Sequence, residues 1–127
     1  MINKRLNTTP EEINESQNNL ISEWNMTDEH NEKIFTKIVG LQLKKIRLAK
    51  GLTQTKVSKK INVTFQQIQK YERGQNELRL INIKKLAEVF DVEESYFYKP
   101  IIDRDLRFIM KKRGINGYPF ESENVAR

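Results

Sequence analysis

The sequence predicts an all-α protein, and three observations support this fold class. Apolar residues recur at helical spacing within residues 34–50 and again within residues 80–90, as they do on the buried side of amphipathic helices. Between these segments, residues 54–61 and 64–73 are predicted to form two short helices separated by only two residues. So short a connection permits only a tight corner, which is typical of a helix-turn-helix.

The second of these short helices carries a start signal. Thr64, followed three residues later by Gln67, matches a capping box, in which the first turn of a helix satisfies its own free N–H groups. Val63 and Ile68 match the hydrophobic staple that often accompanies such a box. These signals predict that a helix begins at residue 64.

The two faces of the helix over residues 64–73 differ in chemistry at about 100° per residue. One face carries Phe65, Ile68, Tyr71 and Glu72, and the other carries Gln66, Gln69, Lys70 and Arg73. Glutamine can pair with adenine through two hydrogen bonds, and lysine or arginine can pair with guanine. An ordinary solvated face has a similar composition, but the capping, the turn length and the surrounding charge favour DNA recognition.

Charge is distributed unevenly along the chain, whose net charge is +6. Residues 38–85 contain 12 Lys and Arg against 2 Asp and Glu, a net charge of +10. Residues 1–37 contain 4 against 7, a net charge of −3. A basic block centred on the predicted helix-turn-helix is expected of a protein that binds a polyanion.

Composition excludes several classes of function. The chain has 127 residues and no cysteine, which allows one modest domain with tails and excludes disulfides, thiolate metal sites and cysteine catalysis. The single histidine, His30, lies in a polar stretch and predicts no metal site. No phosphate-binding loop or metalloprotease motif is present, so we expect neither an enzyme nor a cofactor.

The same composition gives no sign of a membrane or secreted protein. No apolar run is long enough to span a bilayer, and residues 1–10 lack the apolar segment of a secretory signal. We therefore expect a cytoplasmic protein, associated with the nucleoid if it binds DNA.

Residues 39 to about 100, roughly half the chain, resemble the Cro/CI-type (XRE) helix-turn-helix domain of phage repressors and many bacterial regulators. The motifs GLTQ, VT and YERG occur at the right spacings, and the run GLTQ…VTFQQIQKYERG is especially similar to small alphaproteobacterial regulators. Ser58 and Asn62 depart from the usual alanine and glycine, but serine is nearly as small and asparagine tolerates the left-handed conformation.

The resemblance implies a five-helix, lambda-repressor-like domain over residues 34–100, flanked by an extension (1–33) and a tail (101–127). It also implies a transcriptional regulator, expected to be a repressor, that binds a palindromic double-stranded DNA operator as a homodimer through residues 64–73. An antitoxin is the alternative, in which residues 1–33 or 101–127 bind a partner protein.

The resemblance further implies roles for individual residues. Gln54 and Thr64 are expected to contact the DNA backbone, whereas Gln66 and Lys70 are expected to bind base edges. Further base contacts and weaker phosphate contacts are expected from Phe65, Gln69, Lys44, Arg73, Gln75 and Asn76. An arginine at position 47 commonly pairs with the glutamate of the YERG motif, so we expect a buried, structural Arg47–Glu72 ion pair.

Two apolar stripes are predicted on the helix that follows residue 27. Phe35, Val39, Leu43 and Ile46 should face the domain core, and a second stripe comprises Ile34, Ile38, Leu41 and Leu48. A helix that is apolar on two sides usually has two packing partners. We therefore expect the second stripe to be covered, either by a segment carrying Ile13, Leu20 and Trp24 or by another subunit.

Two further segments are predicted with less regular signals. Residues 9–12 match a helix start, with threonine as cap and proline at the first position, but the segment is either a short docking helix or largely disordered. A short fifth helix containing Tyr96, Phe97 and Tyr98 is expected to end at Pro100, followed by one more helix over residues 103–113.

Overall fold

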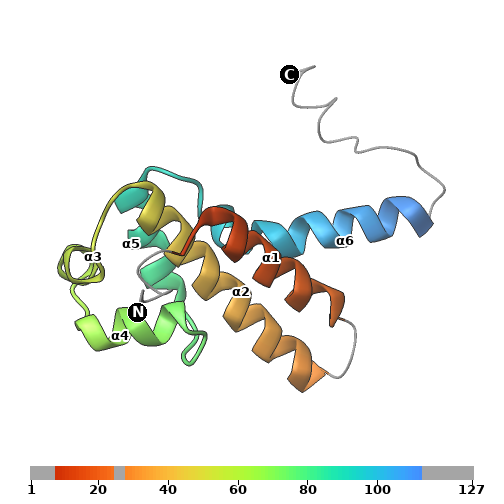
Figure 1. Cartoon of the computed structure of the whole chain (residues 1–127), viewed down its shortest axis with the longest axis horizontal. Coiled ribbons are helices and arrows are strands. Elements are labelled where there is room, and N and C mark those ends of the chain that lie inside the picture. Colours follow the sequence, from red (N-terminus) through yellow and green to blue (C-terminus); the bar gives the residue numbers. More distant parts are fainter. Residues whose placement is uncertain (1–7, 25–27, 113–127) are drawn as a thin grey trace, which may run out of the picture.

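The computed structural model describes residues 8–24 and 28–112, apart from the side chains of Asp28, Phe108, Ile109 and Lys112. Within these ranges it contains helices and no strand, which confirms the all-α fold class (Figure 1). No helix in the described part of the chain is long and apolar enough to cross a bilayer. The elements are α1 (Pro10–Ser22), α2 (Asp28–Ala49), α3 (Gln54–Ile61), α4 (Phe65–Glu72), α5 (Leu80–Phe90), the 3-10 helix η1 (Glu94–Tyr98) and α6 (Lys99–Lys112).

Helices α2 to α5 and η1 enclose one apolar core. Its least exposed members come from all five elements and are Leu43, Val57, Ile61, Ile68, Leu86, Phe90 and Phe97. The helices predicted over residues 54–61 and 80–90 are confirmed by α3 and α5. Val39 and Ile46 of the first predicted α2 stripe also face this core.

Helix ends in the domain follow local backbone chemistry. After α2, Gly51 adopts a φ of 69°, a conformation that favours glycine because it has no side chain. Asn62 ends α3 in the left-handed conformation, with a φ of 58° and a ψ of 51°. Thr64 Oγ1 then accepts a hydrogen bond from the Gln67 N–H at 3.0 Å, which confirms Thr64 as the cap of α4. The bond by which the Gln67 side chain would complete the predicted capping box is not formed between these described residues.

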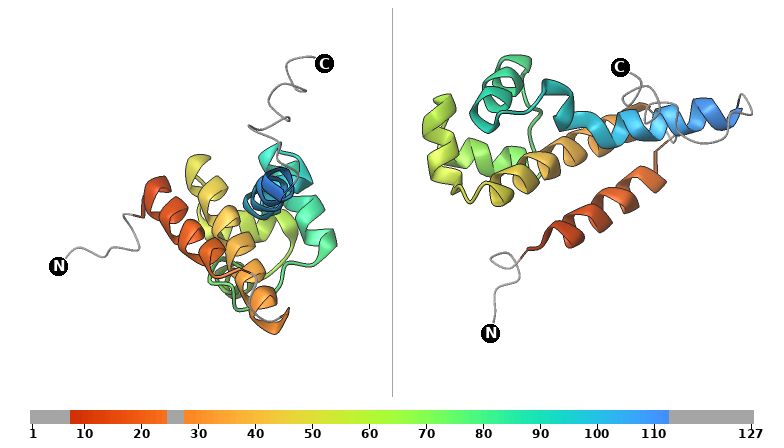
Figure 2. Two further views of the ribbon diagram at one scale, coloured as in Figure 1. Left: turned by 90° about the vertical axis from the view of Figure 1, so that its right-hand side faces the viewer. Right: turned by 90° about the horizontal axis from the view of Figure 1, so that it is seen from above.

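The N-terminal extension contains a regular helix, α1. Thr9 Oγ1 accepts a hydrogen bond from the Glu12 N–H at 3.2 Å, and Glu12 Oε1 accepts one from the Thr9 N–H at 3.2 Å. These reciprocal bonds form a complete capping box, with Pro10 in the first turn. Of the two alternatives for this segment, the docking helix is therefore correct, and α1 lies alongside α2 (Figure 2).

α1 covers part of the second apolar stripe of α2. Ile34 and Ile38 are 2% and 0% exposed, and they form a second cluster against which Leu20 and Trp24 pack. Ile101 of α6 completes this cluster, a contribution that the sequence did not predict. The prediction is confirmed for Ile34 and Ile38, whereas Leu41 is half-buried and Leu48 remains exposed.

A buried chain of amide side chains links α1 to the five-helix domain. Gln17 Nε2 donates to Gln42 Oε1 at 2.9 Å, and Gln42 Nε2 donates to the Tyr96 carbonyl oxygen at 2.7 Å. Both glutamines are buried, and a buried amide is stable only when its polar atoms find partners. α1, α2 and η1 are thus tied together by specific hydrogen bonds as well as by apolar packing.

Two apolar positions lie elsewhere than predicted. Phe35 is 38% exposed and stacks on Tyr98, with 6.4 Å between ring centroids, so it lies outside the core. The apolar spacing within residues 80–90 predicts Leu80 on the buried side of the helix, yet Leu80 is 81% exposed at the first position of α5. The first residue of a helix can lie outside the part of the helix that packs against the core, so apolar periodicity alone does not determine whether its side chain is buried.

The C-terminal part of the domain also corrects the sequence prediction. The expected fifth helix is the 3-10 helix η1, and α6 begins directly after it, at Lys99. Pro100 therefore lies in the first turn of α6 and does not end a helix. Proline is tolerated there because the first N–H groups of a helix have no partner within it.

Candidate nucleic-acid interface

α3 and α4 form a helix-turn-helix that rests on the domain core. Val57 and Ile61 of α3 and Ile68 of α4 are buried in the same cluster. Ser58, at the position usually held by alanine, is 4% exposed, and its hydroxyl donates to the Thr55 carbonyl oxygen at 2.7 Å. The small side chain and its internal hydrogen bond allow α3 to pack closely despite the polar residue.

α4 has one anchored face and one free face. On the anchored face, Ile68 and Tyr71 are buried, and the Tyr71 hydroxyl accepts a hydrogen bond from Asn82 Nδ2 at 3.0 Å. On the free face, Gln66 and Lys70 are exposed, and Gln69 is half-buried. The helix is therefore fixed from behind while its amide and ammonium groups remain available to a ligand.

A groove runs between the second half of α2, the start of α3 and one side of α4. Five of the ten predicted DNA-binding residues line it, namely Lys44, Gln54, Phe65, Gln69 and Arg73. Gln66 and Lys70 project from α4 outside the groove lining, and Thr64 is occupied as the cap of that helix. Gln75 and Asn76 are exposed in the loop after α4.

The buried ion pair lies within this groove. Arg47 Nε and Nη2 donate to the two carboxylate oxygens of Glu72 at 2.6 and 2.9 Å, and Arg47 Nη1 donates to the Leu52 carbonyl oxygen at 3.0 Å. The two side chains belong to α2 and α4, so the pair fixes α4 against α2. Such geometry is bidentate, which adds orientation as well as energy.

Gln54 takes part in the same network. Its Nε2 donates to Glu72 Oε1 at 3.0 Å, and the side chain is half-buried. The expectation for Gln54 was a contact to the DNA backbone, and no sequence signal indicated this bond to Glu72. The structure therefore places its amide between the ion pair and the surface.

Three residues that line the groove were not predicted from the sequence to belong to the DNA-binding surface. Thr53, Thr55 and Leu48 also border the groove. Thr53 caps α3, because its Oγ1 accepts a hydrogen bond from the Lys56 N–H at 3.1 Å. A threonine directly before a predicted helix is a recognisable N-cap, so this residue could have been found from the sequence.

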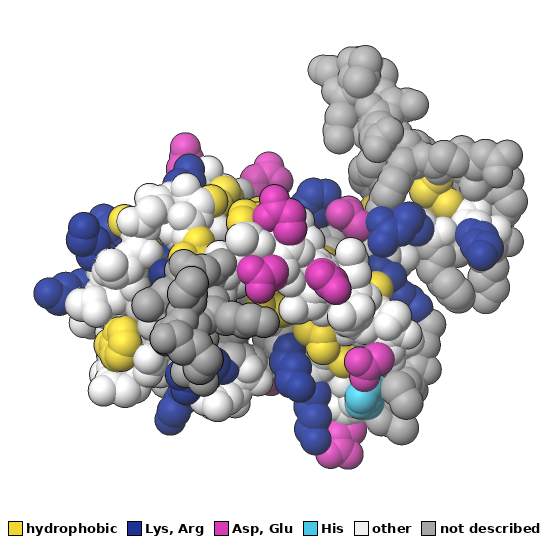
Figure 3. Space-filling view, viewed as in Figure 1, with side chains coloured by type: hydrophobic (Ala, Val, Ile, Leu, Met, Phe, Trp, Pro, Cys, Tyr) yellow, Lys and Arg dark blue, Asp and Glu magenta, His cyan; other side chains and the backbone are white. Residues whose placement is uncertain are grey.

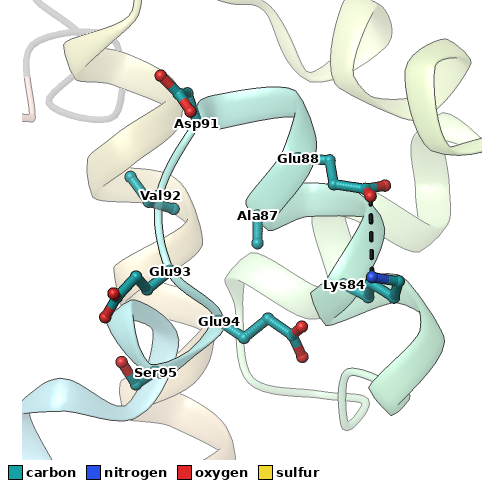
Figure 4. A pocket seen from close by; sticks show the side chains of 8 residues that line it. All are labelled: Lys84, Ala87, Glu88, Asp91, Val92, Glu93, Glu94 and Ser95. Carbon is teal, nitrogen blue, oxygen red and sulfur yellow. Dashed lines mark ion pairs between the residues drawn. The ribbon is translucent and has the colours of Figure 1, made fainter.

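Surface charge differs between the helix-turn-helix and α1. In Figure 3, basic side chains border the end formed by α3 and α4 and also lie over α6, whereas acidic side chains gather over α1. Figure 4 shows a second acidic region where α5 leads into η1, with Asp91, Glu93 and Glu94, and with Glu88 3.8 Å from Lys84. A polyanion would be attracted to the α3–α4 end and repelled by these two acidic regions.

The described residues show no group of three or more His, Cys, Asp or Glu side chains that could hold a metal ion. His30 lies 3.5 Å from a carboxylate oxygen of Glu23, across the connection between α1 and α2. The chemistry that the groove and the α4 surface offer is thus hydrogen bonding and positive charge.

Comparison with known proteins identifies the domain. Residues 43–97 match a helix-turn-helix family model. The chain is 33% identical over 66 residues to an uncharacterised HTH-type transcriptional regulator of Sinorhizobium fredii, covering 52% of this chain and 46% of that protein. It is 36% identical over 69 residues to an uncharacterised transcriptional regulator in the ATPase CF(0) region of Rhodospirillum rubrum. This match covers 54% of this chain and 64% of that protein.

A solved structure is also similar. The restriction-modification controller protein C.AhdI from Aeromonas hydrophila is 33% identical, with a TM-score of 0.47, and the match covers 50% of this chain and 96% of that chain. The chain spans less than two thirds of the length of the two curated relatives. On its motifs and its family match, the part of the chain over residues 43–97 is a helix-turn-helix domain of the Cro/CI-type (XRE) family.

Proposed function

We propose that this regulator is a repressor that binds a palindromic operator as a homodimer through α4. The observation that carries the proposal is the two-sided environment of α4. Its apolar side is buried in the core, whereas Gln66 and Lys70 project from the opposite side at the basic end of the molecule. A helix of this kind fits the major groove, and a two-fold dimer binds half-sites about one helical turn apart.

Within this proposal, the polar residues around α4 divide into two groups. Gln66 and Lys70 bind base edges, with Gln69 secondary and the Phe65 ring placed against a thymine methyl group. Lys44, Arg73, Gln75 and Asn76 contact phosphates, as do Gln54 and Thr64 near the helix starts. Phosphate contacts fix the register of the protein on DNA, and base contacts select the sequence.

The proposed homodimer uses the exposed apolar side chains at the start of α5. Leu80 and Ile81 are 81% and 48% exposed at the start of α5, and large exposed apolar side chains that lie together often mark an interface. Residues 34–100 would then form the DNA-binding and dimer-forming unit, working in the cytoplasm at the nucleoid. Residues 1–33 are less suited to capture a toxin, because α1 buries Ile13 and Gln17 within its own chain.

Selection of bound sequences from random DNA duplexes tests the proposal as a whole. We expect an enriched motif with two-fold symmetry and half-sites about 10 base pairs apart. An asymmetric motif of a single half-site would contradict the homodimer, and the absence of any enriched motif would contradict sequence-specific recognition by α4. Repression itself is tested by placing the selected motif before a reporter gene, whose expression should fall when the regulator is present.

Neutralising Lys44 is expected to weaken binding to all DNA sequences alike. Lys44 is half-buried at the groove, where an ammonium group would displace a counterion from a phosphate. In Lys44→Ala, the slope of log affinity against log salt should flatten by about one unit. Fluorescence anisotropy over a salt series measures this slope, and Lys33→Ala, an exposed lysine outside the groove, should leave it unchanged. A change in sequence preference would contradict the phosphate assignment.

Removal of the Gln66 amide is expected to affect the specific site only. Gln66→Ala should lose about 1–3 kcal/mol on the selected motif and relax preference at particular base pairs, while nonspecific affinity changes little. Lys70→Ala should show a similar loss on the motif. Asn18→Ala, which removes an exposed amide from α1, serves as a matched control with no expected effect. Equal loss on every sequence after Gln66→Ala would exclude Gln66 as a base contact.

A further inference from the structure

A small pocket lies outside the proposed DNA-binding surface, where three segments of the chain meet. It has a volume of about 180 Å³ and is bordered by the residue Trp24 just after α1, the first half of α2 and the loop between α4 and α5. Its lining residues are Trp24, Asn31, Glu32, Phe35, Thr36 and Glu77. A pocket of this size suits a ligand smaller than a typical drug molecule.

Two aromatic rings contribute the apolar lining, and both are held in place by contacts elsewhere. Trp24 packs against the cluster of Ile34, Ile38 and Ile101. Phe35 stacks on Tyr98 at an interplanar angle of 25°, yet it keeps 38% of its surface exposed. Rings that are already ordered lose little conformational freedom when a ligand binds against them.

Two carboxylates share this pocket with the rings. Glu32 and Glu77 come from α2 and from the loop after α4, and neither forms an ion pair with another described residue. The lining contains no lysine or arginine, although the chain as a whole carries a net charge of +6. The Thr36 hydroxyl already donates to the Glu32 carbonyl oxygen at 2.9 Å. Hence the pocket combines two aromatic side chains with two exposed carboxylates that have no ion-pair partner among the described residues.

We infer that this pocket binds a small organic cation, a quaternary or alkylated ammonium group. Such a group is attracted to the faces of Trp and Phe rings, and its charge would be balanced by Glu32 and Glu77. A metal ion or an inorganic cation would gain little from the aromatic lining. Glu77 belongs to the same loop as Gln75 and Asn76, so under the proposed function a bound cation would lie next to phosphate contacts. The inference about binding does not depend on that function.

Fluorescence of Trp24, the single tryptophan, reports directly on the pocket. Choline chloride is titrated into the full chain at constant chloride concentration, and 3,3-dimethyl-1-butanol, its uncharged analogue of the same shape, is titrated in parallel. We expect a saturable change of Trp24 emission with choline, half-complete at about millimolar concentration, and no saturable change with the alcohol. No DNA is present, so failure of the proposed DNA function would leave this readout intact.

Variants then locate the site. Glu77→Gln and Phe35→Leu should each weaken choline binding about fivefold, because they remove one carboxylate or one ring while retaining similar volume. Glu29→Gln, an exposed acid on α2 that does not line the pocket, should bind as the unmodified chain does. Far-UV circular dichroism verifies that each variant is folded. An equal response to the alcohol, no response to choline, or unchanged affinity in both pocket variants would overturn the inference.

Discussion

Replacing Glu72 with alanine is expected to lower the free energy of unfolding by about 3–5 kcal/mol. Glu72 and Arg47 are 6% and 8% exposed, and the carboxylate accepts two hydrogen bonds from the guanidinium group. Removal of the carboxylate leaves the arginine charge buried without its partner, and this desolvated charge accounts for most of the loss. Urea denaturation followed by far-UV circular dichroism measures the change.

Two further variants separate the ion pair from its surroundings. Gln54→Ala removes only the third donor to Glu72, a half-buried neutral group, and should lower the free energy of unfolding by about 1 kcal/mol. Glu72→Leu combined with Arg47→Met removes both charges together and should be more stable than Glu72→Ala. A loss below about 1 kcal/mol in Glu72→Ala would contradict the buried pair, since an exposed pair contributes no more than that.

The helix-turn-helix could be predicted because its signals are local. Thr64 and Asn62 act through the backbone within a few residues of themselves, so capping and the left-handed turn are visible in the sequence. Ile68 and Tyr71 follow helical periodicity, which holds when a helix has one dominant packing partner. The roles of the DNA-facing residues remain predictions, because they depend on a ligand.

The features that could not be predicted from the sequence depend on contacts between distant parts of the chain. Gln17 and Gln42 look like surface residues in the sequence, and only the packing of α1 on α2 makes them buried hydrogen-bonding partners. Phe35 follows the periodicity of the core stripe but stacks on Tyr98, more than sixty residues later in the sequence. The composition of α1 does not distinguish a docking helix from a disordered segment. The difference depends on the apolar stripe of α2, on which α1 packs.

Replacing Gly40 with alanine is expected to lower the free energy of unfolding by about 2–3 kcal/mol and to displace α4. A Cβ atom at this position of α2 would lie 2.1 Å from the Tyr71 carbonyl oxygen and 3.1 Å from that of Glu72. The obstacle is backbone, so no side chain can rotate away, and α4 itself must move. Overpacking of this kind typically costs about 1–3 kcal/mol, and here the Tyr71 carbonyl also accepts the hydrogen bond from the Gly74 N–H that closes α4.

The sign of this change distinguishes close packing from helix propensity. Alanine is about 1 kcal/mol more favourable than glycine inside a helix, so propensity alone predicts that Gly40→Ala stabilises the protein. Gly51→Ala is the control: its Cβ meets nothing within 4 Å, and only its φ of 69° is unfavourable, at about 1 kcal/mol. The Gly51→Ala protein should bind DNA normally when folded, whereas folded Gly40→Ala should lose affinity because Gln66 and Lys70 move with α4. A Gly40→Ala protein as stable as the unmodified chain would show that α2 and α4 do not approach so closely.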